Sequence, residues 1–108
     1  MFEQLLEALQ GTGVPFVAYG WDNAPSGIYG VVSLDSGAGT IAGDQKIIQQ
    51  AVEGTVDLYL QEIGTRYPQT IQGVLNDFEG CAWYLNSIQY EKETHLVHWE
   101  WVFQLEMM

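Results

Sequence analysis

Positively charged residues are scarce in this sequence. The 108 residues contain 3 Lys and Arg against 14 Asp and Glu, so the formal net charge at pH 7 is −11. The three cations, Lys46, Arg66 and Lys92, are widely separated along the chain. Affinity for nucleic acid comes largely from cations that displace counterions from phosphates, so this composition argues against both specific and nonspecific nucleic-acid binding.

Cysteine and long apolar segments are also lacking. The single cysteine, Cys81, cannot form an internal disulfide, which is typical of a protein made in a reducing compartment. No apolar stretch approaches the length of a membrane span, and no basic segment precedes an apolar one as in a signal peptide. We therefore expect a soluble chain without a membrane partner, made in a cytoplasm.

The length and the apolar content indicate one globular domain over residues 1–108. Hydrophobic residues make up 47% of the chain, which excludes a disordered tail. A chain of this size buries only about two thirds of the surface that its unfolded form exposes. The core is therefore modest, and association with further copies or with a partner would bury more apolar surface.

Two segments have the apolar spacing of amphipathic helices. The face of the first consists of Phe2, Leu5, Leu6 and Leu9. The second begins near Pro68, which fits the first turn of a helix, and is expected to end at Gly80 as its C-terminal cap. Its apolar face consists of Ile71, Val74, Leu75 and Phe78.

Five segments are predicted to be strands: residues 14–21, 28–35, 48–60, 82–90 and 94–105. The third and fifth alternate between apolar and polar side chains, as strands do. The start of the third also fits a helical face, so its beginning stays open. The order α-β-β-β-α-β-β predicts an α+β fold, in which two helices pack on one face of a mostly antiparallel sheet.

A segment of small residues between the second and third strands is predicted to be a flexible loop. Four of its first eight residues are Gly or Ser, and its apolar content is too small to fix it. We expect it to be mobile in the isolated protein and ordered only in an assembly. The segment consists of Ser36, Gly37, Ala38, Gly39, Thr40, Ile41, Ala42, Gly43 and Asp44.

Aromatic residues dominate one face of the last strand. Trp99, Trp101 and Phe103 share a parity, and alternate aromatics on a strand can line either a core or a ligand groove. Because two helices are available to cover this face, we expect these side chains to pack beneath them.

One segment matches a nucleotide-binding motif superficially. Residues 37–42 have the form G-x-G-x-x-A, and Asp57 follows Gly37 by 20 residues, as in a dinucleotide fingerprint. That motif must open a helix directly and place its acidic residue at the end of the next strand. Here Gly43 and Asp44 interrupt any helix and Asp57 falls in the middle of a strand, so no dinucleotide cofactor is expected.

Other candidates for site chemistry are similarly incomplete. His98 and Glu100 share a face of the last strand while His95 lies on the other face, and two potential ligands do not make a metal site. Cys81 lies in no nucleophile motif and is expected to be a small buried hydrophobic residue. Glu91 and Glu93 flank a lysine at a hairpin tip, where solvation explains them. We expect no enzymatic activity, no cofactor and no metal.

The order of elements and several local segments resemble the small tail terminator proteins of long-tailed bacteriophages and prophages. After the first helix come "VPFVAYG", the proline turn and strand "APSGIYGVV", a glycine-rich excursion to "GDQKII", "VDLYL", the second helix and a terminal hairpin with "VHWEW". The resemblance covers nearly the whole chain. It departs most at residues 67–69, where Tyr-Pro-Gln replaces the charged start of the second helix that the resemblance implies.

The resemblance implies a structural virion protein that caps the completed tail tube as a ring, usually of six copies, and forms the joint to the head. Its partners would be further copies of itself, the tail tube protein and the head-tail connector, with no cofactor. It would occur in the host cytoplasm during assembly and in the virion tail. A negative ring lumen would also repel passing DNA. The segment 36–44 is the candidate contact with the tail tube or a neighbouring subunit.

Two other functions stay open from the sequence. A head-tail joining or neck protein would share the ring but bind the head connector. A small acidic binding module that mimics nucleic acid would instead be a monomer with a tight basic partner.

Overall fold

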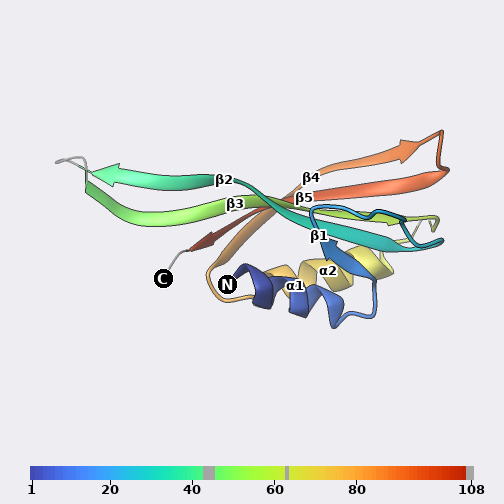
Figure 1. The fold of residues 1–108 in the computed structure, drawn as a ribbon, viewed down its shortest axis with the longest axis horizontal. Helices are drawn as coiled ribbons and strands as arrows, with labels where there is room; N and C mark the ends of the chain where they lie inside the picture. Colours follow the sequence, from blue (N-terminus) through green and yellow to red (C-terminus); the bar gives the residue numbers. More distant parts are fainter. Residues whose placement is uncertain (43–45, 63, 107–108) are drawn as a thin grey trace.

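Two helices lie on one side of a five-stranded sheet in the computed structural model (Figure 1). The structure describes residues 1–42, 46–62 and 64–106. The elements follow the predicted order α-β-β-β-α-β-β, which confirms the α+β architecture. The molecule is elongated, with principal extents of 51 × 27 × 26 Å.

Both helices form where the apolar spacing predicts them. Helix α1 spans Phe2–Gln10 and buries Leu5 and Leu9, whereas α2 spans Arg66–Asp77 and buries Pro68, Ile71 and Leu75. Pro68 lies in the first turn of α2, where the missing N–H breaks no intrahelical hydrogen bond. No helix among the described residues is long and apolar enough to cross a membrane.

The end of α2 differs from the prediction. Its C-cap is Phe78, in an extended conformation, and not Gly80. Gly80 has a φ of +77° in the turn that leads into the next strand, and its carbonyl accepts a hydrogen bond from the Glu106 N–H at 2.9 Å. The glycine is therefore used for the turn into the sheet and not for ending the helix.

The sheet is mixed, with strand order β1-β2-β3-β5-β4. Its strands are β1 Phe16–Ala18, β2 Tyr29–Ala42, β3 Lys46–Leu60, β4 Cys81–Glu91 and β5 Leu96–Glu106. Three of the four pairings are antiparallel, and only β1 with β2 is parallel. The first strand is much shorter than the predicted residues 14–21, and only Phe16 of its three residues is fully buried.

The prediction of a loop at residues 36–44 is wrong for most of this segment. Residues 36–42 belong to β2 and pair in an antiparallel register with β3, from Ser36 opposite Glu53 to Ala42 opposite Lys46. The small residues of this segment predict a loop when they are considered alone. The partner strand nevertheless satisfies their backbone hydrogen bonds, so they form a strand. Gly43 and Asp44, the end of the predicted loop, lie outside the described residues.

The outer part of this hairpin extends beyond the rest of the sheet. Ala51 opposite Glu106 is the last pairing between β3 and β5, and beyond it β3 pairs only with β2 among the described residues. We call residues 39–42 and 46–50 the arm. In Figure 1 the arm projects away from both helices and from the β4–β5 hairpin.

The core lies between the helices and one face of the sheet. Trp101 and Phe103 are buried, as predicted, and Trp99 is partly buried with its ring 5.9 Å from that of Trp101. Val32, Val56, Leu58 and Leu105 also belong to the buried sheet face, beneath the leucines of α1 and α2. The Trp101 Nε1–H donates to Gln72 Oε1 on α2 at 3.1 Å, so its one polar group is satisfied.

Candidate functional site

The sheet face opposite the helices carries a row of stacked rings. Tyr29, Tyr59 and His98 occupy directly opposed positions on β2, β3 and β5. The ring centroids are 4.9 Å apart for Tyr29 and Tyr59 and 4.3 Å apart for Tyr59 and His98, each pair with 16° between planes. Trp21 extends the row with an edge-on contact to Tyr29 and donates to the Gly30 carbonyl at 3.0 Å.

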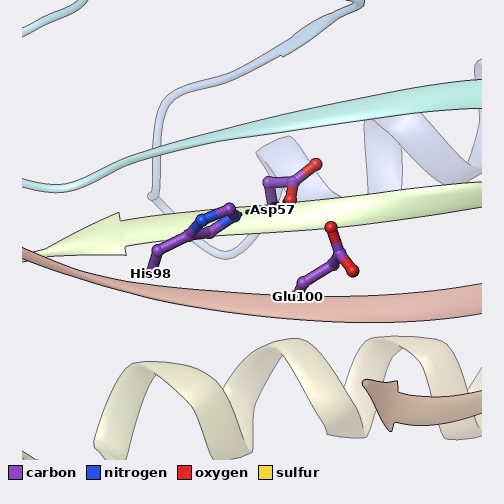
Figure 2. A group of neighbouring side chains, drawn as sticks. All are labelled: Asp57, His98 and Glu100. Atoms are coloured by element: carbon purple, nitrogen blue, oxygen red, sulfur yellow. Dashed lines mark hydrogen bonds and ion pairs between the residues drawn. The ribbon is translucent and has the colours of Figure 1, made fainter. Parts of the chain in front are cut away.

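Three polar side chains converge beside the end of this row (Figure 2). Asp57 lies on β3 directly opposite Glu100 on β5, and His98 lies two residues before Glu100 on the same face. His98 Nε2 is 2.6 Å from Asp57 Oδ1, and one ligand atom from each of the three residues falls within 4.8 Å of the others. We call Asp57, His98 and Glu100 the polar cluster.

Neighbouring groups hold the members of the polar cluster in position. Glu91, at the end of β4, brings Oε2 to 3.6 Å from His98 Nδ1, so both imidazole nitrogens face a carboxylate. The Asn86 Nδ2–H donates to Glu100 Oε1 at 2.6 Å, and Asn86 lies at a register shift in β4. Stacking on Tyr59 fixes the plane of the imidazole. The side chains of His98 and Asp57 are each only 16% exposed.

The surroundings favour the protonated form of His98. The hydrogen bond to Asp57 raises the pKa of His98, burial opposes this shift, and the charges of Asp57, Glu91 and Glu100 add to the increase. Burial, with a further contribution from the same carboxylates, raises the pKa of Tyr59 to about 12. Within the described part of the chain, no ion pair joins Lys or Arg to Asp57, Glu91 or Glu100. Up to three negative charges thus surround one imidazole.

The sequence prediction found two members of the polar cluster and missed the third. His98 and Glu100 do share a face of β5. Asp57 lies in the middle of β3, as the sequence predicts, but no local pattern predicts its pairing with β5. The alternation of β3 places Asp57 on the polar face of this strand. Which residues Asp57 contacts depends on the register between β3 and β5, and His98 is 41 residues away from it in the sequence.

The remaining candidates lie away from the polar cluster. His95 is exposed in the turn between β4 and β5, and its Nδ1 is 3.0 Å from the Tyr90 hydroxyl. Cys81 is partly buried against the core, and burial raises the pKa of its thiol to about 11. Residues 37–42, which matched the dinucleotide motif, lie within β2 and open no helix.

A second surface of interest is the edge strand β4. It pairs only with β5, so its other edge has no partner strand among the described residues. Four large apolar or aromatic side chains on β4 are strongly exposed: Tyr84 (56%), Leu85 (38%), Ile88 (51%) and Tyr90 (59%). Leu85, Ile88 and Tyr90 oppose Trp101, Trp99 and Val97 and thus extend the apolar face of the sheet past the helices. An unpaired apolar edge of this kind is typical of a contact surface.

Comparison with known proteins assigns this chain to no family. No protein-family model matches the sequence, and no curated protein matches it. Among solved structures, one chain of the virion of a native gene transfer agent particle is similar to this protein, with a TM-score of 0.48 and 16% sequence identity. The match covers 94% of this chain and 82% of that chain.

Proposed function

We propose that this protein is a structural protein of a phage-type tail, which caps the tail tube as a ring and forms the joint to the head. The observation that carries the proposal is the arm, a two-stranded extension of the sheet that has neither a third strand nor a helix beside it among the described residues. A two-stranded hairpin is marginally stable on its own in water. An arm of this length is therefore best explained as a segment that packs against another chain.

The free edge of β4 supplies a second contact surface on the same molecule. The arm and the β4–β5 hairpin project in different directions from the body (Figure 1). A subunit with two unlike contact surfaces can join the next subunit head to tail, and such contacts close into a ring when the rotation per subunit is right. The element order and the segments that resemble tail terminators support the same role.

The net charge determines the conditions under which such a ring would form. With a net charge of −11, subunits repel one another at low ionic strength, where screening is weak. The isolated protein would then be a monomer in dilute low-salt buffer and close its ring at higher salt, at higher concentration or on the tail end. No catalytic step and no cofactor are part of this proposal.

The experiment is to shorten the arm without touching the body. Residues 39–50 are replaced by Asn-Gly, a turn that fits a two-residue hairpin between Ala38 and Ala51. The variant should keep the thermal unfolding midpoint within a few degrees, because the arm lies beyond Ala51 and Glu106, the last pairing between β3 and β5. It should no longer co-sediment with tail tubes that bind the parent protein.

A matched control changes the body surface instead. Gln69→Ala removes an exposed side chain of α2 and leaves the arm and β4 intact, so it should bind tubes like the parent. Equal binding of the shortened protein and the parent would contradict a role for the arm. Binding of the parent to isolated head connectors but not to tail tubes would favour a neck protein over a tail cap.

A further inference from the structure

We propose that the polar cluster binds one divalent transition-metal ion, of the zinc type, through Asp57, His98 and Glu100. This inference does not depend on the proposed tail function, because it concerns the sheet face away from the helices and uses no residue of the arm.

The donor set and its spacing fit such an ion. An imidazole with two carboxylates is a ligand set that zinc and its neighbours accept. Ligand atoms bonded to one zinc at about 2.1 Å lie at most about 4.2 Å apart. The three ligand atoms already fall within 4.8 Å of one another, so small side-chain rotations would close the set. Three protein ligands leave a further coordination position for water.

Residues around the polar cluster also orient its ligands, as second-sphere residues do in known metal sites. Metal-binding histidines usually turn their second ring nitrogen toward a carboxylate or a carbonyl. His98 does this with Nδ1, which faces Glu91, and Tyr59 stacks on the ring. Asn86 holds Glu100 through its amide. Each of these outer partners comes from a strand next to the ligand it orients, on β3 or β4.

Charge favours a cation at this point. Asp57, Glu91 and Glu100 bring three carboxylates around one imidazole, and within the described ranges no Lys or Arg side chain pairs with them. Binding would replace the proton between His98 Nε2 and Asp57 by the metal. The proton is released to the buffer, and the imidazole becomes neutral with its remaining hydrogen on Nδ1, toward Glu91.

The test uses Zn²⁺ and Co²⁺ with the full chain at neutral pH. Calorimetry should find one Zn²⁺ per chain, and Co²⁺ should give visible absorption bands from a low-symmetry site. Asp57→Asn and His98→Gln should each weaken Zn²⁺ binding at least about tenfold. In the NMR spectrum, Zn²⁺ should shift Nε2 of His98 and not the ring nitrogens of His95. Because Asp57→Asn keeps an acceptor near His98, it tests the site even if His98→Gln fails to fold.

Two matched controls separate a site from general attraction to an acidic surface. Glu53→Gln removes a carboxylate from β3 outside the polar cluster, where it accepts from Gln104 at 3.4 Å. His95→Asn removes the other histidine, at a φ of 57° that Asn tolerates well. Both should bind Zn²⁺ like the parent. The proposal is overturned if no Zn²⁺ binds, if Asp57→Asn and His98→Gln bind as well as these controls, or if Mg²⁺ binds as tightly as Zn²⁺.

Discussion

His98 Nε2 lies 2.6 Å from Asp57 Oδ1, on the neighbouring strand, although the two residues are 41 positions apart in the sequence. The contact joins the polar face of β3 to that of β5 on the side of the sheet away from the core. It exists because Val56 and Trp101 are paired on the buried face, which sets the register for the opposite face as well. The core thus determines where these charges meet.

This contact makes the stability of the metal-free protein depend on pH. Asp57 raises the pKa of His98 above its usual value of about 6.5. The stabilisation is therefore fully present below about pH 6.5 and is lost as pH rises through the raised pKa of the folded state. With a chelator present, Asp57→Asn should cost on the order of 1 kcal/mol at about pH 5.5 and clearly less at about pH 9. Denaturant unfolding of both proteins measures this difference, and a difference that does not change with pH would contradict the assignment.

Trp101 tests the core beneath the helices. Its side chain is fully buried and donates to Gln72 on α2. Trp101→Ala should lower the free energy of unfolding by about 3 to 5 kcal/mol, since it leaves a large cavity and an unpaired amide. Tyr84→Ala, at an exposed position on β4, should change it by less than about 0.5 kcal/mol. If Trp101→Ala unfolds at the same temperature as the parent and as Tyr84→Ala, Trp101 is not part of the core.

Gly54 and Gly73 should respond to alanine with opposite signs. A methyl group at Gly54 would meet the backbone of Ser33 and the Phe103 ring, whose Cζ lies 2.7 Å away. Gly54→Ala should destabilise the protein by about 1 to 3 kcal/mol. Gly73 lies within α2, and no described atom outside the helix backbone lies within 4 Å of the added methyl, so Gly73→Ala should stabilise the protein by roughly 0.5 to 1 kcal/mol. Equal effects of the two changes in chemical unfolding would refute this packing around Gly54.

The sequence predicts the parts of the fold that local patterns encode. The spacing of Leu5 and Leu9 indicates α1, and the alternation through Trp101 and Phe103 indicates a strand with one buried face. The outer half of β2 could not be predicted in this way. Its Ser, Gly and Ala residues have weak strand preference, and they form a strand because β3 pairs with them across the hairpin.

The same distinction holds for the polar cluster. The parity of His98 and Glu100 follows from the alternation in one strand, whereas their meeting with Asp57 depends on the pairing of β3 with β5. These two strands are neighbours in the sheet although they are not consecutive in the sequence, because β5 lies between β3 and β4. A period-two pattern specifies the face of each side chain but not the strand beside it.

The length of tails assembled with and without this protein tests the proposed function most directly. If the protein caps the tube, tails made in its absence should grow to variable length and fail to join heads. Supplying the parent protein, but not the variant with the shortened arm, should restore one uniform length with a ring visible at the head-proximal end in electron micrographs. Tails of normal length that join heads in its absence would contradict the proposal.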